Sequence, residues 1–450
     1  MNPALSRREL LAAVVPLLAC ASRRPTGPRP DILLVTFCSL RADRVGALGY
    51  TARATTPRLD AFASGATRFT RAWANATWTN PTHASILTGL FLGHHRVADD
   101  LDTLVLGAPT LSGLLRDAGW RAAATLQEST QMSLPDASGI TRDFSEVSRP
   151  KLMSQWAPEP FAAWAAAEPT PFFGFVHLRA AHSPFGAGAP FVPVGSLHPD
   201  IVKWQAGLPR MGSDIAPIWS ETTDPNRWLM ERMRQDPLVA EQLSLAYDSA
   251  VHAADAHFGQ VLDALAAVGR LANTVVVVVA DHGESLPGHK DRMERRVLHI
   301  PLIIGVPGGM GRVVGDDVSQ VDIVPTLLEL ANVSSRTSFD GQSLVPLLNG
   351  EAMAARPAFS QSISRSPDGA VVRREAIVSG GLRLVQFDDT HWDIELEKDG
   401  VVARANVVTP AAEALHAQLQ ELGDDTWEPT DAPAQVSNEL RKQIQQGGYW

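Results

Sequence analysis

Five consecutive valines, Val275 to Val279, constrain the fold of this chain more than any other segment. β-branched side chains pack well on a pleated surface, so this apolar run predicts a strand that is buried on both faces. Asp281, His282 and Gly283 follow almost at once. Open α/β sheets bind ligands beyond the carboxyl ends of their strands, and a buried carboxylate needs a cation or hydrogen bonds to compensate it. The sequence therefore predicts a metal site or an anion-handling site at this strand end. A solvated Asp–His turn is the alternative.

Other apolar runs repeat the pattern of a buried strand. Residues 31–38 and 171–178 predict two more strands, and residues 240–268 carry apolar side chains at three- and four-residue spacing, which predicts a long helix. Strands that alternate with helices favour an α/β fold whose large sheet is mostly parallel and has helices on both faces.

The texture of the chain changes after about residue 350. Short strands are predicted at residues 376–379, 382–387 and 392–396, with turns at 380–381 and 388–389, and a helix at 411–422. We therefore predict an α/β domain over residues 31–350, a small C-terminal antiparallel subdomain over 351–422 and a polar tail over 423–450. Residues 183–239 are rich in Pro, Gly and Trp, which predicts a long irregular insertion; it is either a lid or an excursion with its own small core.

Bulk composition excludes some classes of function. The chain has 450 residues and a net charge of −10, whereas proteins that bind nucleic acid present basic faces. No segment after the N-terminus is long and apolar enough to span a membrane.

The first twenty residues are typical of an export signal. Two arginines, Arg7 and Arg8, precede an apolar stretch at residues 10–19, and the segment ends in Cys20 in a sequence like a bacterial lipobox. We therefore predict residues 1–20 as a signal peptide, a lipid on Cys20 that anchors the protein to a membrane, and a linker over residues 21–30. The expected location is the bacterial cell envelope, either lipid-anchored or periplasmic. An ordinary cleaved secretory signal is the alternative.

Five segments in order along the chain resemble the sulfatase family of the alkaline phosphatase superfamily. They are residues 40–50, 79–89, 281–284, 321–326 and 340–344. The resemblance covers about residues 31–420. It implies an alkaline-phosphatase-like sheet and a hydrolase that acts on a sulfuric or phosphoric ester, either of a small molecule or of a glycan.

The resemblance assigns the nucleophile to Thr79, although family sulfatases have a Cys or Ser there that is converted to formylglycine. A threonine does not give formylglycine by that route, so formylglycine is not expected. A threonine is the nucleophile in related phosphoryl-transfer enzymes, but its hydroxyl needs a base or a metal to activate it. The alternative is that Thr79 only caps the helix that contains Pro81.

The resemblance also implies one divalent cation. Asp281 and His282 keep the expected ligand types, but Cys38 and Ser39 stand where the family usually has Asp-Asp or Asp-Thr, so a hard oxygen ligand is lost. Calcium prefers oxygen ligands, whereas a thiolate, an imidazole and a carboxylate can hold zinc. We expect Zn²⁺ or Ca²⁺ on Asp281, His282 and Cys38. The alternative is that Cys38 is a buried small side chain and no metal binds.

Three further residues are assigned to the substrate by the same resemblance. Lys290 would contact a sulfuryl or phosphoryl oxygen, His182 would protonate the departing oxygen, and His83 stands where the family has an arginine. His83 would replace that cation only below about pH 6.5, the unperturbed pKa of an imidazole. Three departures from the family pattern, at Cys38, Thr79 and His83, motivate a second hypothesis: a non-catalytic relative that binds a ligand or partner.

Overall fold

The computed structural model describes most of the chain from residue 29 to residue 423. The described residues are 29–99, 102–127, 134–150, 156–183, 185, 190–192, 195–207, 225–287, 293–365, 371–387, 392–398, 401–404 and 409–423. The positions predicted for the signal peptide, the lipidated cysteine, the turn at 388–389, the polar tail after its first residue and Lys290 lie outside them.

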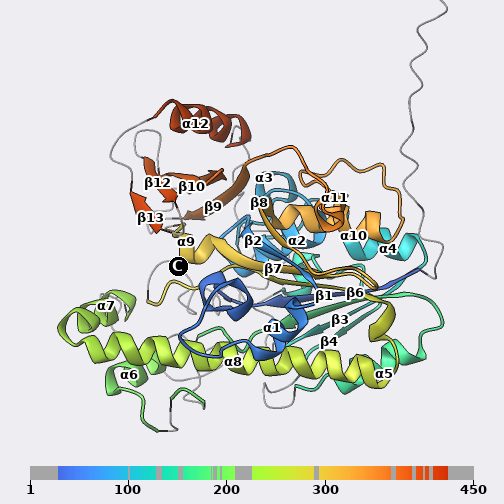
Figure 1. The fold of residues 1–450 in the computed structure, drawn as a ribbon, viewed down its shortest axis with the longest axis horizontal. Coiled ribbons are helices and arrows are strands. Elements are labelled where there is room, and N and C mark those ends of the chain that lie inside the picture. Colours follow the sequence, from blue (N-terminus) through green and yellow to red (C-terminus); the bar gives the residue numbers. More distant parts are fainter. Residues whose placement is uncertain are drawn as a thin grey trace, which may run out of the picture.

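An eight-stranded sheet forms the centre of the molecule (Figure 1). Its strands lie in the order β4 (Glu146–Ser148), β3 (Arg121–Leu126), β5 (Phe172–Leu178), β1 (Asp31–Phe37), β6 (Thr274–Ala280), β7 (His299–Gly305), β2 (Thr67–Trp73) and β8 (Val313–Ser319). Only β7 runs antiparallel to its neighbours. The three strands predicted from apolar runs are adjacent in the centre, and every residue of β1, β5 and β6 is buried. The predicted mostly parallel sheet is confirmed.

Helices cover both faces of this sheet (Figure 1). One layer contains α1 (Pro57–Ala63), α5 (Glu159–Ala167), α6 (Pro199–Gly207), α7 (Pro225–Gln235) and α8 (Pro237–Ala267). The other contains α2 (Thr79–Thr88), α3 (Leu92–His95), α4 (Leu111–Asp117), α10 (Ile323–Leu330) and α11 (Val345–Asn349). The short helix α9 (Arg295–Leu298) leads into β7, and 3-10 turns lie at η2 (Ala42–Arg44), η3 (Gly46–Leu48), η4 (Asp136–Ser138), η6 (Leu271–Asn273) and η8 (Gln320–Asp322).

The predicted long helix is α8, which begins at Pro237 and ends at Ala267. Asp236 caps it by accepting a hydrogen bond from the backbone N–H of Leu238, and Pro237 fits its first turn because no intrahelical N–H is needed there. Its buried stripe includes Leu243, Tyr247 and Phe258, as the three- and four-residue spacing predicts.

A five-stranded antiparallel sheet follows the large one in the chain. Its order is β13 (Val401–Arg404), β12 (Trp392–Lys398), β11 (Leu382–Gln386), β10 (Val371–Ser379) and β9 (Ala358–Arg365), and α12 (Pro410–Gly423) packs on it (Figure 1). The predicted strands, the turn at Gly380 and Gly381, and the final helix are confirmed.

The prediction of an irregular insertion at residues 183–239 is wrong for its described part. That part contains α6, α7 and the start of α8. Trp204 is buried, and its ring lies 6.3 Å from that of Phe185, which packs in turn on Tyr247 of α8. This tryptophan therefore joins the main core, so the described part is a packed excursion.

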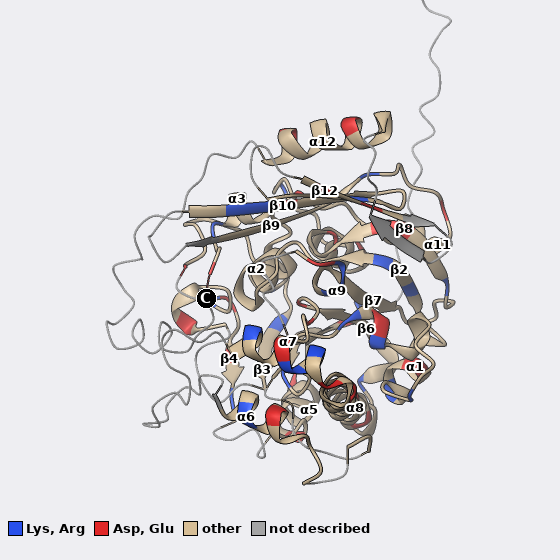
Figure 2. Ribbon diagram, turned by 90° about the vertical axis from the view of Figure 1, so that its left-hand side faces the viewer, with Lys and Arg blue, Asp and Glu red and all other residues tan. Residues whose placement is uncertain are grey.

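None of the described helices combines the length and apolarity that a bilayer span requires. In Figure 2, α7 carries arginines and one glutamate, whereas the charged side chains of α8 are all acidic.

Candidate functional site

The candidate site lies beyond the carboxyl ends of three neighbouring strands. In the register of β1 with β6, Phe37 lies opposite Ala280, so Cys38 and Asp281 are the first residues past the two strand ends. The Asp281 N–H donates to the Phe37 carbonyl at 3.2 Å, which continues the pairing by one residue. This edge is where parallel sheets place their ligands, as the valine run predicts.

The Asp281 carboxylate is fully buried and only half satisfied. Its Oδ1 accepts from the backbone N–H groups of Ser39 at 2.8 Å and His282 at 2.6 Å, whereas Oδ2 accepts no hydrogen bond from the described residues. Burial would raise the pKa of Asp281, but the imidazoles of His282, His83 and His177 and the Ser39 N–H outweigh it and hold this pKa well below its usual range. Asp281 is therefore an anion at neutral pH.

A strained turn brings Ser39 to this carboxylate. Ser39 has φ of 60°, in the left-handed region that non-glycine residues seldom adopt. Tyr247 of α8 stabilises this turn, because its hydroxyl donates to the Ser39 carbonyl at 2.7 Å and accepts from the Arg41 N–H at 3.0 Å. Strain of this kind persists where the surrounding structure fixes it, which is common at functional sites.

Thr79 is the first residue of α2, and its side chain does not cap the helix. The N-cap is Trp78, which makes no side-chain capping bond, so the interpretation of Thr79 as only a cap is wrong. The Thr79 Oγ1 lies 3.3 Å from Nε2 of His282 and 3.9 Å from Sγ of Cys38. The side chain is nearly buried, with 9% of the residue exposed.

Hydrogen bonding fixes the tautomer of His282. Its Nδ1 lies 2.7 Å from the Gly283 carbonyl, which only accepts, so the proton is on Nδ1. In the neutral imidazole, Nε2 carries a lone pair toward the Thr79 hydroxyl, and this nitrogen lies 3.6 Å from Oδ2 of Asp281. Gly283 lets the backbone of α9 pass close to this loop, because a Cβ at residue 283 would lie 1.9 Å from the Arg296 carbonyl oxygen.

The predicted metal ligands lie at one strand edge, but their arrangement does not provide a complete site. Over the described ranges, no three His, Cys, Asp or Glu side chains are placed to share one metal ion. The Sγ of Cys38 faces hydroxyl groups, with Thr79 at 3.9 Å and Ser39 at 3.8 Å. A divalent ion on Asp281, His282 and Cys38 therefore stays a prediction, and the described donor set does not fit it.

His83 does not provide the cation that the family arginine would supply. It is fully buried in α2, and burial lowers its pKa despite the opposing effects of Asp281 and the Thr79 carbonyl. Its Nδ1 lies 2.7 Å from the Thr79 carbonyl oxygen, and its Nε2 lies 3.0 Å from Oγ1 of Thr36. His83 is thus a neutral hydrogen-bonding group inside the protein.

His182 follows β5 at the same edge of the sheet. It is half-buried, and its Nδ1 lies 2.5 Å from the Ser183 carbonyl oxygen and 3.5 Å from a guanidinium nitrogen of Arg179. The roles predicted for His182 and Lys290 stay predictions.

Sequence reasoning missed Thr36 and His177. They lie opposite each other in the β1–β5 register, both are fully buried, and Oγ1 of Thr36 lies 2.9 Å from Nδ1 of His177. The available signal was a polar residue near the end of each apolar run, at positions that parallel strands bring together.

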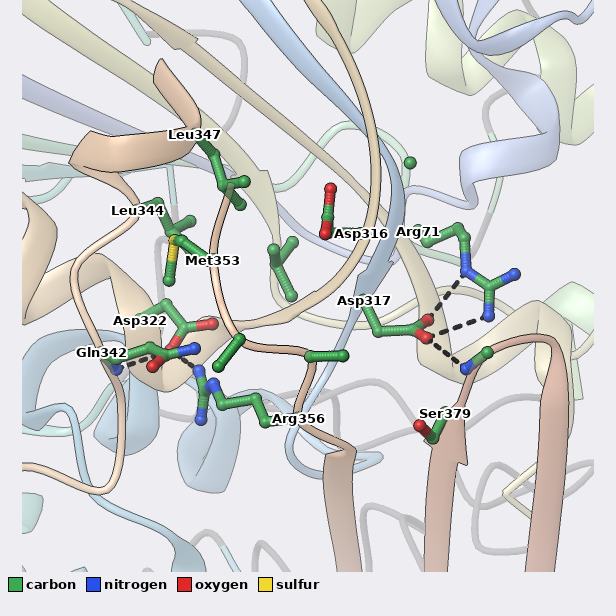
Figure 3. A pocket seen from close by; sticks show the side chains of 15 residues that line it. Arg71, Asp316, Asp317, Asp322, Gln342, Leu344, Leu347, Met353, Arg356 and Ser379 are labelled. Carbon is green, nitrogen blue, oxygen red and sulfur yellow. Dashed lines mark hydrogen bonds and ion pairs between the residues drawn. The ribbon is translucent and has the colours of Figure 1, made fainter. Parts of the chain in front are cut away.

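A separate cavity of about 330 Å³ lies at the junction of the two sheets (Figure 3). Arg71 of β2 donates to both carboxylate oxygens of Asp317, and the Gly380 N–H donates to Asp317 from the β10–β11 turn. Across the cavity, Arg356 contacts Asp322. Arginines therefore compensate Asp317 and Asp322 on these walls, and Asp317 joins the small sheet to β8.

These features define a hydrolase-like site: a hydroxyl at a helix start, beside an imidazole and a carboxylate at the end of a buried parallel strand. The sequence model of the sulfatase family matches residues 30–333, and that of the N-sulphoglucosamine sulphohydrolase C-terminal region matches residues 288–425. The chain belongs to the sulfatase family.

Individual relatives agree with this assignment. Arylsulfatase K of Xenopus laevis is 29% identical over 194 residues, which are 42% of this chain but only 33% of that protein. Delta 4,5-hexuronate-2-O-sulfatase of Bacteroides thetaiotaomicron is 24% identical over 369 residues, 74% of this chain and 75% of that protein. A phosphonate monoester hydrolase from Silicibacter pomeroyi has a similar fold, with a TM-score of 0.63, 20% identity, and coverage of 93% of this chain and 96% of that one.

Proposed function

We propose that this protein hydrolyses an ester of sulfuric or phosphoric acid with Thr79 as nucleophile and His282 as its base. One observation carries the proposal: the Thr79 hydroxyl lies 3.3 Å from Nε2 of His282, whose Nδ1 is held by the Gly283 carbonyl. A threonine hydroxyl is a weak nucleophile that needs an adjacent base, and hydrogen-bond reach between the two is the geometric requirement.

The proposed reaction has two steps. In the first, the Thr79 oxygen bonds to sulfur or phosphorus while the bond to the ester oxygen breaks; the Thr79 proton moves to His282, and protonated His182 gives a proton to the departing alcohol. In the second, water attacks the Thr79 ester and gives a proton to His182, while the Thr79 oxygen takes its proton back from His282. The imidazolium formed on His282 is 3.6 Å from Oδ2 of Asp281, whose negative charge stabilises it.

The relatives support the choice of substrate. They are named as sulfatases and as a phosphonate monoester hydrolase, so their substrates are esters of tetrahedral oxyanions. The N-terminus of α2, where Thr79 lies, carries the positive end of a helix dipole, which favours an anion. A small sulfated or phosphorylated molecule or glycan is the substrate class we propose, with Lys290 as a further contact.

Replacing His282 by glutamine tests the base. We expect kcat toward 4-nitrophenyl sulfate or 4-nitrophenyl phosphate to fall about 10²- to 10⁴-fold, because glutamine accepts a hydrogen bond but takes up no proton. Initial rates at pH 7.5 measure this. His416→Gln, on α12 of the small sheet, is the control and should keep the wild-type rate. Equal rates for His282→Gln and wild type on every ester turned over would remove His282 from the mechanism.

A second candidate is a non-catalytic member of the family that binds an anionic ligand. The neutral, buried His83 at the position of the family arginine favours it, because a charge contact to the substrate is lost. Wild-type protein that binds an aryl sulfate in calorimetry but turns over neither ester would support this candidate over hydrolysis.

We also propose that the mature protein is exported and held at a membrane by a lipid on Cys20. Arg7, Arg8 and the apolar stretch before Cys20 support this. Cys20→Ser is expected to move the protein from the membrane pellet to the soluble fraction, measured by immunoblotting. Ser22→Ala is the matched control. Persistence of Cys20→Ser in the pellet would argue against the lipid anchor.

A further inference from the structure

A chain of buried polar groups runs from β5 through β1 to the start of α2. His177 lies 2.9 Å from Thr36, Thr36 lies 3.0 Å from His83, and His83 lies 2.7 Å from the Thr79 carbonyl oxygen. Thr36, His83 and His177 are fully buried. Buried polar networks are stable only when their members satisfy one another, so the direction of each hydrogen bond is constrained.

Those directions follow from the final acceptor. The Thr79 carbonyl only accepts, so Nδ1 of His83 must donate. Burial keeps His83 neutral, so its Nε2 carries a lone pair and accepts from the Thr36 hydroxyl. The Thr36 oxygen is then left to accept from His177, which places the proton of His177 on Nδ1. Nε2 of His177 has no hydrogen bond within the described residues, as expected for the nitrogen without a proton.

We propose that Thr36 and His177 are positioning residues that hold the nucleophilic Thr79 in place through His83. This inference rests on the proposed function for the role of Thr79 as nucleophile. The carbonyl that His83 holds belongs to Thr79 itself, so the chain restrains the backbone that carries the reacting hydroxyl.

Packing restrains the same imidazole from the side. The His83 ring lies 4.7 Å from the His177 ring and 5.8 Å from the Phe175 ring, with edge-to-face geometry in both pairs. The Phe175 and His177 rings of β5 and the Thr36 hydroxyl of β1 thus fix one orientation of the His83 ring. Small displacements of a reacting group are costly in catalysis, about 10²-fold for about 1 Å.

The tautomers give a test that does not depend on activity. Long-range ¹H–¹⁵N spectra of histidine-labelled wild-type protein at pH 7.5 should show His83 and His177 neutral and protonated on Nδ1. Free neutral imidazoles exchange between tautomers, so two fixed Nδ1–H forms are a specific signature. Protonation of neutral His83 or His177 on Nε2 instead of Nδ1 would overturn the hydrogen-bond directions assigned here to Thr36, His83 and His177.

Thr36→Val removes the central hydroxyl at nearly constant volume. We expect kcat to fall about 10- to 100-fold with KM within about 2-fold of wild type, and Thr36→Ser to restore kcat. The Thr79 methyl resonance should shift in Thr36→Val and return in Thr36→Ser. Thr125→Val, at a buried threonine of β3, is the matched control and should change neither readout.

The outcomes separate this inference from the proposed function. An unmoved Thr79 methyl resonance in Thr36→Val would overturn the positioning role, whatever the activity. If the Thr79 methyl resonance shifts in Thr36→Val but the wild-type protein hydrolyses no ester, the positioning of Thr79 is supported and hydrolysis is rejected.

Discussion

Replacing Thr79 by valine is expected to lower kcat for ester hydrolysis at least about 10³-fold, the larger of the activity effects we predict. Removing the attacking oxygen eliminates the covalent route, and loss of a nucleophile in enzymes of this type leaves only the catalysis supplied by binding and the surrounding dipoles. The change is nearly isosteric, and within the described residues the hydroxyl makes only long contacts, to His282 at 3.3 Å and Cys38 at 3.9 Å. The free energy of unfolding should therefore change by only about 1 kcal/mol.

Steady-state rates with the aryl sulfate and the aryl phosphate measure this effect. Thr79→Ser keeps a hydroxyl and should retain measurable turnover. Thr88→Val is the matched control on the same helix, because the Thr88 hydroxyl donates to the Ala84 carbonyl within α2, away from the reacting group. A Thr79→Val variant with wild-type kcat would exclude Thr79 as the nucleophile and favour the binding-only candidate.

If Thr79 and His282 act as one unit, the double variant should be no slower than Thr79→Val alone. Groups that work in a single step are non-additive, since removing either one already abolishes that step. Additive losses would instead indicate that His282 stabilises the substrate independently of the nucleophile.

Much of the fold follows from local pattern in the sequence. The strands β1, β5 and β6 were predicted because their apolar runs are long, continuous and buried on both faces. The helix α8 was predicted because its apolar stripe repeats regularly. The prediction for residues 183–239 is wrong because their many Pro and Gly residues resemble a loop. In the described part, tertiary contacts such as that of Trp204 with Phe185 stabilise helices there.

The sequence predicts only those site residues that lie in the sulfatase-like segments. Thr79 and His282 were identified from the sulfatase-like segments, and the structure brings their polar atoms to 3.3 Å. Thr36 and His177 were missed because they lie 141 positions apart, and their pairing depends on the strand order β5–β1–β6. Topology of this kind cannot be read from periodicity, which reports each strand's own environment but not its neighbour.

The neutral state of the histidines near α2 predicts that the fold is sensitive to acid. Lowering the pH from 7 to 4.5 is expected to reduce the free energy of unfolding by several kcal/mol. Burial lowers the pKa of His83, holds that of His177 well below 6.5, and lowers that of His95 to about 3. Below pH 6.5 the unfolded chain therefore binds more protons than the folded one, and stability falls by about 1.4 kcal/mol per pH unit for each such group.

Asp255 acts in the opposite direction over part of this range. Burial raises its pKa to about 6, so below pH 6 its protonation in the folded state stabilises the protein and offsets about one histidine. Asp281, whose pKa is lowered, adds to the loss only when the pH falls below the ordinary range of a carboxyl group. Glu375, whose pKa burial also raises, acts in the same direction as Asp255. His177, whose pKa is held well below 6.5, still contributes a loss of about 1.4 kcal/mol per pH unit below about pH 6, and His83 adds to this loss only down to its own pKa. Typical domains have only about 5–15 kcal/mol of stability, so this loss is a substantial fraction of the total by about pH 4.5.

Urea denaturation followed by tryptophan fluorescence at pH 7, 6, 5.5 and 5 measures the slope. His95 offers the clearest variant, because its Nδ1 accepts from the Val97 N–H at 3.0 Å and its Nε2 donates to Ser85 at 3.1 Å. His95→Gln should be less stable at pH 7 but should lose about 1.4 kcal/mol less per pH unit than wild type, since the amide takes up no proton. His416→Gln, on α12, should keep the wild-type slope. An equal slope in His95→Gln and wild type would show that burial does not keep the His95 imidazole neutral in the folded state.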